Sequence, residues 1–390
     1  MTTRGPLPAT TPLREIVRAI VSVPTAPYLE AGVRAHIREF AAERALDCVE
    51  DAYGNVYGRY RRGRAGRPLV LGAHMDHPGF VVASRRGRTL ELEFRGGLDA
   101  TYGRGEQLRL YPADPADPAG SAELGTARIE SVRADERGRI AGASARLAPG
   151  AEAVAGDLAL WDVAACAFRG ELVLARQCDD LAGCAAVLAT LDYAAAFRPP
   201  GHLVGLFTRA EEVGLRGAVV ASGAGLLPDD AVVIAVETSS QAGGRARQGD
   251  GPVIRVGDAM HVFSPAVTRW MTALAQELAA EDATFAFQRK LMDGGVTEAT
   301  AYDLLGYETG AACVALGNYH NAGPRGRIAA ETVHLGDLDA LVSLFVHMLG
   351  RLPELDRALP ELRARFERIG REARPALRAT RRTSPHRPRA

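Results

Sequence analysis

Two adjacent acids, Glu211 and Glu212, follow closely on an apolar run at residues 203–207. Neighbouring carboxylates repel each other unless a cation, a proton or several hydrogen-bond donors stabilise them. Such pairs are therefore typical of sites in which one acid binds a metal ion while its neighbour transfers protons. Acids are also favourable in the first turn of a helix. Taken alone, the pair favours this second interpretation.

Four other segments strengthen the first interpretation, because each places a potential metal ligand at the end of an apolar run or the start of a helix. Three of the runs are predicted to be buried strands, and the fourth is long enough for a helix. The strands are predicted at 68–73, 231–236 and 311–317, and the helical run at 185–191. The polar residues beside the four runs are His74 with Asp76, Glu237, His320, and Asp179 with Asp180.

These segments are expected to meet in space. In open α/β sheets, ligands bind in the crevice beyond the carboxyl ends of the strands, so residues that end strands or open helices can converge there. Two histidines and three carboxylates suit zinc or a similar divalent ion. One carboxylate shared between two ions would make a paired site.

Three motifs resemble those of the tetrahedral, or glutamyl-type, aminopeptidases, a family of dinuclear-metal exopeptidases. They are His74-Met75-Asp76 followed by Gly79-Phe80, Asp179-Asp180 with Gly183, and Glu211-Glu212-Val213-Gly214-Leu215-Arg216-Gly217-Ala218. The resemblance covers roughly residues 10–350. It implies a peptide substrate and a homo-oligomer, built of dimers that assemble into a twelve-subunit shell.

The resemblance also implies a ligand set for two divalent ions, with zinc as the first choice and cobalt or manganese as alternatives. Asp179 would bridge both ions. Glu212 and His320 would complete one site, and His74 and Glu237 the other.

Glu211 would be the general base of this centre, taking the proton of a bridging water and returning it to the leaving amine. Asp76 would accept a hydrogen bond from the far nitrogen of His74 and so fix the orientation of the ring. Asp180 would support the same loop as Asp179, and His77 adjoins the ligand loop, where it could touch substrate.

Glu237 stands where this family usually has Asp. Glu at this position is familiar among related carboxypeptidases and N-acyl hydrolases. The leading prediction is an aminopeptidase acting on short peptides. An N-acyl amino acid deacylase or carboxypeptidase on the same metal centre is the second hypothesis, and an inactive metal-binding scaffold is the third.

The spacing of the motifs predicts an inserted domain. Between His74 and Asp179 lie 104 residues, far more than the ~2 to 6 that join a strand to a helix. Alternating runs at 89–94 and 107–110, with short runs at 127–132 and 158–161, predict a small β-barrel there. By resemblance, this barrel would help to build the oligomer and partly wall the active site.

The remaining sequence alternates helical and strand patterns, which predicts an α/β domain with a mixed, largely parallel sheet flanked by helices. Helices are expected from Thr11-Pro12, and at 29–46, 265–282 and 335–349. The predicted domains are a catalytic α/β domain in two parts at 1–84 and 169–355, a β-rich oligomerisation domain at 85–168, and a C-terminal helix with an Arg/Pro-rich disordered tail at 356–390.

Overall composition argues against two classes of partner for the body of the protein. The net charge is zero, which gives no reason to propose binding to nucleic acid or membranes. No apolar run approaches the ~20 residues that a membrane span needs, and the N-terminus lacks an apolar signal core, so the expected location is the cytoplasm.

The segment 371–390 holds seven Arg and three Pro but a single acid. This composition predicts a disordered tail, because so few apolar residues cannot stabilise a fold. A solvated extension is favoured over a tail that binds nucleic acid or an acidic partner.

Overall fold

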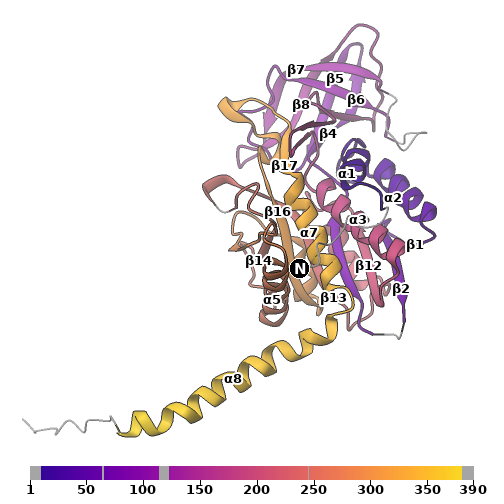
Figure 1. Ribbon diagram of the computed structural model, residues 1–390. Coiled ribbons are helices and arrows are strands. Elements are labelled where there is room, and N and C mark those ends of the chain that lie inside the picture. The colour runs from indigo at the N-terminus through magenta and orange to yellow at the C-terminus, as the bar shows by residue number, and fades with distance from the viewer. Residues whose placement is uncertain (1–9, 64–65, 114–122, 245, 380–390) are drawn as a thin grey trace, which may run out of the picture.

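The computed structural model describes residues 10–63, 66–113, 123–244 and 246–379. Its centre is an eight-stranded mixed sheet with helices on both faces, and a β-barrel lies at one end of the molecule (Figure 1). In spatial order, the strands of the sheet are β1 (Asp47–Glu50), β2 (Val56–Arg62), β12 (Gly201–Thr208), β3 (Leu69–His74), β13 (Val232–Ser240), β16 (Glu308–Leu316), β14 (Val253–Gly257) and β15 (Gln288–Leu291).

The four central strands, β12, β3, β13 and β16, run parallel to one another. β2 and β14 pair antiparallel to this group on its two sides. The carboxyl ends of the four central strands therefore lie along one edge of the sheet. The predicted mixed, largely parallel sheet is confirmed, and so are the strands expected beside His74, Glu237 and His320.

Successive side chains of a strand point to opposite faces of the sheet, and each face packs against its own layer of helices. Leu69 and Leu71 of β3 join the larger hydrophobic core, whereas Val70 between them joins a second cluster. The larger core receives residues from α1 (Leu13–Val21), α2 (Ala31–Glu43), α3 (Leu181–Phe197), α5 (Pro265–Glu281) and α7 (Leu335–Met348). The second cluster receives residues from α4 (Arg216–Gly223) and α6 (Glu298–Leu304). The helices predicted from sequence are confirmed.

The insert is a closed six-stranded barrel, as predicted. Its strands in order around the barrel are β4 (Gly79–Arg86), β5 (Thr89–Arg95), β8 (Ile140–Leu147), β7 (Gly125–Ala134), β6 (Gln107–Tyr111) and β9 (Leu158–Trp161). Phe80, Phe94 and Trp161 pack ring against ring inside it. The barrel has its own hydrophobic core, and its strands begin at Gly79, only five residues after His74.

A second, three-stranded sheet connects the barrel region to the catalytic elements. It consists of β10 (Cys166–Arg169), β11 (Leu172–Ala175) and β17 (Glu331–His334), all antiparallel. β11 leads into the segment that carries Asp179, and β17 carries Glu331. The sheet therefore places the strand that precedes Asp179 beside the strand that carries Glu331.

The C-terminal helix α8 (Leu352–Ala379) projects away from the body (Figure 1). The predicted disordered tail from residue 371 is wrong for residues 371–379, which continue this helix. The prediction of disorder is based on the number of charged residues in this segment and does not consider the spacing of its apolar residues, which is that of a helix. The rest of the predicted tail, 380–390, lies outside the described residues. Among the helices that the structure describes, none is both long and apolar enough to cross a bilayer.

Candidate metal centre

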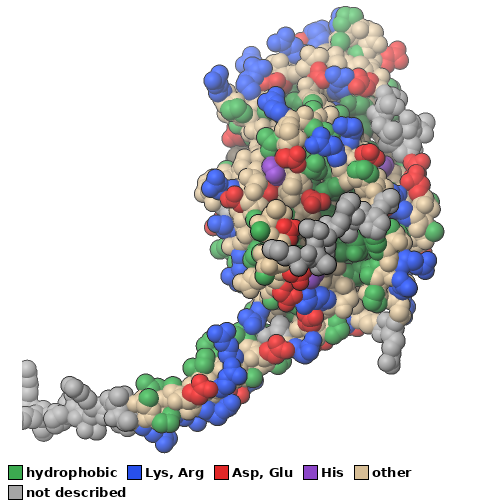
Figure 2. Space-filling model, in the orientation of Figure 1, with side chains coloured by type: hydrophobic (Ala, Val, Ile, Leu, Met, Phe, Trp, Pro, Cys, Tyr) green, Lys and Arg blue, Asp and Glu red, His purple; other side chains and the backbone are tan. Residues whose placement is uncertain are grey.

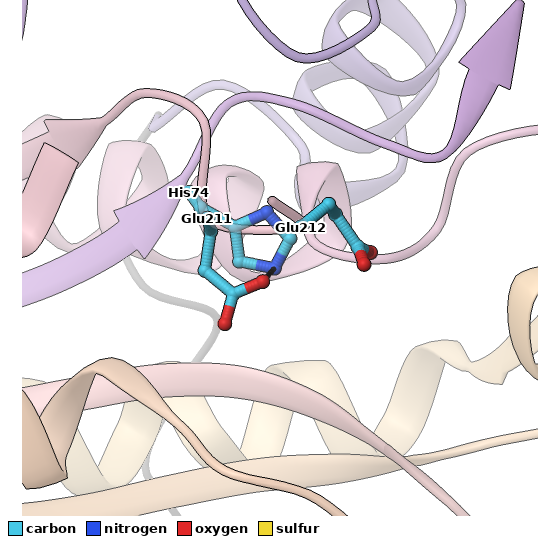
Figure 3. A group of neighbouring side chains, drawn as sticks. All are labelled: His74, Glu211 and Glu212. Carbon is cyan, nitrogen blue, oxygen red and sulfur yellow. Dashed lines mark ion pairs between the residues drawn. The ribbon is translucent and has the colours of Figure 1, made fainter. Parts of the chain in front are cut away.

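Glu211 and Glu212 lie in the loop between β12 and α4, beside the carboxyl end of β3, where His74 is the last residue. The Asp76 carboxylate holds this loop, because it accepts hydrogen bonds from the backbone N–H groups of Glu211 (2.9 Å) and Glu212 (3.1 Å). Figure 3 shows the Glu211 carboxylate directed at the His74 ring, while the Glu212 carboxylate extends to the other side. The loop thus presents its two acids in different directions.

Asp179 lies between the two histidines of the site, at the start of the segment that leads into α3. One carboxylate oxygen, Oδ1, is 3.4 Å from Nε2 of His74, and the other, Oδ2, is 3.7 Å from Nε2 of His320. His320 also lies 3.1 Å from an oxygen of Glu212. A single carboxylate therefore faces two separate groups of ligand atoms.

Three overlapping sets of side chains could hold a metal ion, each with its ligand atoms within 4.8 Å of one another. They are His74 with Asp179 and Glu237, Asp179 with Glu212 and His320, and His74 with Glu211 and Glu212. The structure therefore brings together all five predicted ligands and the predicted base. Imidazole nitrogens and carboxylate oxygens are the donors that zinc takes in catalytic sites, so the residues present fit such an ion.

Backbone carbonyls orient both histidines. Nδ1 of His74 donates to the carbonyl of Asp76 at 3.0 Å, and Nδ1 of His320 donates to the carbonyl of Gly97 at 2.6 Å. Both rings thereby turn Nε2 toward Asp179. Gly97 belongs to the barrel, between β5 and β6, so the inserted domain helps to position a candidate ligand.

The role expected of the Asp76 side chain differs from its observed contacts. Its carboxylate lies 3.7 Å from Nδ1 of His74, beyond hydrogen-bonding distance, and the backbone carbonyl of the same residue makes the contact instead. The side chain instead accepts hydrogen bonds from the backbone N–H groups of Glu211 and Glu212. A sequence motif identifies such a residue but not which of its oxygens is used.

Glu237 lies within β13 rather than after it, because the strand continues to Ser240. Its carboxylate accepts a hydrogen bond of 2.5 Å from the Thr297 hydroxyl, at the start of α6. Arg255 of β14 lines the same pocket and is only 4% exposed. Its guanidinium donates to the Ser239 hydroxyl and to the Met292 carbonyl.

Glu331 is a positioning residue that the sequence reasoning missed. It is fully buried and accepts hydrogen bonds from the backbone N–H of Asp179 (2.9 Å) and that of His320 (2.8 Å). One carboxylate thus fixes the backbone of two candidate ligands that are far apart in the chain. Its only signal in the sequence is an acid in a short strand, which matches no motif.

His77 and Asp180, which lie beside predicted ligands in the sequence, contact other protein groups. His77 is buried and contacts the backbone carbonyl of Asp179 (2.6 Å) and the side-chain oxygen of Asn321 (3.1 Å). It is not among the residues that line the pocket. Asp180 is fully buried above Gly183, where any side chain would collide with its carboxylate, and burial raises the pKa of Asp180 well above its usual value.

The charges at the centre strongly perturb one another. Burial raises the pKa of Glu211 well above its usual value, and the nearby acids Glu212 and Glu237 add to this effect. Burial alone would lower the pKa of His320, but Glu212 and Asp179 outweigh it and raise the pKa to about 9. Burial would raise the pKa of Asp179, but the neighbouring histidines hold it below its usual value. The cluster therefore attracts cations.

Known proteins share this arrangement of elements. The Pyrococcus horikoshii TET1 peptidase superposes with a TM-score of 0.67 at 21% identity, over 86% of this chain and 99% of that one. The aminopeptidase APDkam598 from the archaeon Desulfurococcus kamchatkensis superposes with a TM-score of 0.70 at 19% identity, over 87% and 94%. These likenesses show the fold.

The sequence comparisons show the family. A glutamyl aminopeptidase of Lactococcus lactis subsp. cremoris is 24% identical over an alignment of 305 residues, and the alignment covers 73% of this chain and 86% of that protein. A family model described as M42 glutamyl aminopeptidase matches residues 54–344, well over half of the chain. The chain therefore belongs to the M42 glutamyl aminopeptidase family, a family of metal-dependent exopeptidases.

Proposed function

We propose that this aminopeptidase removes N-terminal residues from short peptides at a centre of two divalent ions, with zinc as the first candidate. The observation that carries the proposal is the position of Asp179, whose two oxygens face His74 and His320 separately. A carboxylate in this position can bridge a pair of ions.

The ligands would be divided between the two ions around Asp179. His74 and Glu237 complete one set, and Glu212 and His320 complete the other. Two divalent ions bound there would polarise the scissile carbonyl and lower the pKa of a water molecule toward neutrality. This division uses every candidate ligand once, apart from the shared Asp179, and leaves Glu211 as the remaining carboxylate.

Glu211 is the residue that would move protons. Its carboxylate lines the pocket, and its burial raises its pKa, which makes it a stronger base than an exposed Glu. It would accept a proton from the attacking water and donate it to the leaving amine. The hydrogen bonds from the Glu211 loop to Asp76 keep this carboxylate beside His74.

Glu211→Gln tests this mechanism. The amide keeps the size of the side chain but cannot accept the proton, so kcat should fall by about 10²–10⁴-fold while bound metal is unchanged. Glu39→Gln, an exposed Glu on α2, is the matched control and should keep full activity. Full peptidase activity in the metal-loaded Glu211→Gln enzyme would rule out the assignment.

Two observations favour a second candidate function, an N-acyl amino acid hydrolase or a carboxypeptidase. Glu237 stands where Asp is usual in the family, and Arg255 places a buried cation in the pocket, where it could bind a substrate carboxylate. A panel of matched substrates, with a free N-terminal amine or an acylated one, separates the two functions. Faster turnover of the acylated members would replace aminopeptidase with hydrolase activity of this kind.

A homo-oligomer is the proposed state of the protein. The related TET1 peptidase is described as assembling into a tetrahedron or a large octahedral shell, and the barrel of this chain corresponds to the inserted domain expected to help build such an assembly. Sedimentation equilibrium of the purified protein measures its mass directly, and a monomer over the whole concentration range would contradict the proposal.

A further inference from the structure

Helix α8 (Leu352–Ala379) stands apart from the family features described above. The family match ends at residue 344, before this helix begins. The helix projects away from the body, and Figure 2 shows hydrophobic side chains along it, interspersed with basic ones. Its function therefore has to be sought in its own sequence and contacts.

Apolar residues along α8 alternate in spacing between three and four. This spacing is the heptad pattern of a coiled coil, in which the first and fourth positions of each seven-residue repeat form a continuous seam. The seam positions are Leu352, Leu355, Leu359, Leu362, Phe366, Ile369, Ala373 and Ala376. The pattern continues through nearly four repeats, with alanines at the seam positions of the last one.

Only the beginning of the seam is covered by the body. Leu352 and Leu355 are 7% and 2% exposed and belong to the main hydrophobic core. Further along, Leu359 is 41% exposed and Phe366 is 63% exposed. The same stripe thus passes from a packed surface to an open one.

The open part of the seam has the shape that receives a partner helix. Leu359, Leu362, Arg363 and Phe366, together with Pro360, line a shallow hollow on α8. The first four are related as i, i+3, i+4 and i+7, which is the set of four residues that forms the hole for a side chain of the facing helix in a coiled coil. The prolines within α8, Pro360 and Pro375, occupy heptad positions outside the seam.

We propose that α8 pairs with α8 of a second copy of this chain as an antiparallel coiled coil. Charges beside the seam select the orientation and the register. With the two-fold axis between residues 367 and 368, Phe366 faces Ile369 of the second copy, and Arg365 faces Glu372 of the second copy, twice by symmetry. Opposite charges in such flanking positions determine the choice and orientation of partners.

Alternative arrangements lack this charge complementarity. A shift by one heptad in either direction would place Arg365 opposite Arg365, or Glu372 opposite Glu372. A parallel pair would place Arg365 opposite Gly370 of the second copy and leave Glu372 opposite Leu377. The sequence therefore matches a second copy of itself in one antiparallel register. This pairing does not depend on the function proposed for the metal centre.

Disulfide cross-linking in the full-length protein tests the pairing directly. Phe366→Cys and Ile369→Cys chains, each with its own tag, are co-expressed, purified through both tags and mildly oxidised. We expect an interchain disulfide between the two differently tagged chains, in higher yield than between two Phe366→Cys chains. The matched control pairs Ala364→Cys with Arg371→Cys, which lie at the same axial separation but on the outward face, and should not cross-link.

Charge reversal provides a second measurement. Arg365→Glu and Glu372→Arg should each lower the cross-linking yield at least about threefold, and the double reversal should restore it. Within each helix, the double reversal turns two attractive pairs at four-residue spacing, with Glu361 and with Arg368, into repulsive ones, so these pairs oppose the restoration. Equal yields in the seam and control pairs, or a higher yield between two Phe366→Cys chains, would overturn the antiparallel pairing.

Discussion

The candidate metal centre and helix α8 differ in how their residues are brought together. The centre collects side chains from five separate segments. The carboxylates of Asp76 and Glu331 accept hydrogen bonds from the backbone N–H groups of four of the clustered residues and hold them in place. Helix α8 is one continuous segment whose main apolar positions beyond Leu355 are open to solvent. All candidate ligands of the first region come from one chain, whereas the open part of the second would be buried only by a partner.

This difference indicates what each region depends on. The centre concentrates negative charge in a buried pocket and therefore depends on cations, either protons or metal ions. The seam of α8 carries no buried charge and depends on apolar contact, with charges only along its borders. Substitutions can separate these two dependences, and the largest effect is expected at the residue that both ligand sets share.

Asp179→Asn should lower kcat/KM at least about 10³-fold, which corresponds to about 4 kcal/mol of transition-state stabilisation. Asparagine preserves the shape of the side chain but removes the charge that both ligand sets share. Bound metal, measured by elemental analysis after gel filtration, should fall in parallel. Asp47→Asn changes an exposed carboxylate in the same way and should alter neither quantity. Undiminished activity and metal content in Asp179→Asn would contradict a shared ligand.

Substitution of Glu298 tests how much a buried charge at the centre lowers the free energy of unfolding. It is 1% exposed, accepts a hydrogen bond from the Thr208 hydroxyl (2.5 Å), and burial raises its pKa to about 7. The unfolded chain loses this proton near the ordinary value of 4.5, so the folded state holds the extra proton between these two pKa values. In chelator, wild-type stability should therefore fall as pH rises from 4.5 to about 7.

Glu298→Gln carries no titrating group and should lack this loss. Its free energy of unfolding, relative to wild type, should increase by about 3 kcal/mol across the window and stay constant above it. Urea unfolding at intervals from pH 4 to pH 8 measures the difference. Parallel stability curves for the two proteins would show that Glu298 does not titrate in this range.

The same contrast between the two regions explains how much could be predicted from the sequence. The candidate ligands were identifiable because each follows a strongly apolar run or opens a helix, and the ends of parallel strands meet by geometry alone. Glu331 and the amide contacts of Asp76 were not identifiable, since they bond to backbone groups far away in the chain. Residues 371–379 were misjudged because their basic composition suggested disorder, although the spacing of Ala373, Ala376 and Leu377 continues a helix.

The boundary between the packed and open parts of α8 gives the next prediction. Leu355→Ala should lower the free energy of unfolding by about 2–3 kcal/mol, because a buried side chain leaves a cavity in the core. Leu377→Ala makes the same change on the same helix at a position that is 67% exposed, and should cost less than about 1 kcal/mol. Urea unfolding at neutral pH compares the two, and equal losses would mean that the body does not end its contact near Leu355.

The smallest effect is expected from Asp76→Asn, which keeps all candidate ligands and weakens only the support of the Glu211 loop. The new amide has one oxygen left to accept a backbone N–H, so one of the two hydrogen bonds to Glu211 and Glu212 is lost. Supporting residues of this kind are worth about 10-fold to 100-fold, and we expect the lower figure, in kcat rather than KM. Asp337→Asn is the matched control, because the Asp337 carboxylate on α7 also accepts one backbone N–H at each oxygen, from Gly249 and Gly251. If both variants keep wild-type kcat, the Glu211 loop is held in place without Asp76, and the completeness of the centre rests on its ligands alone.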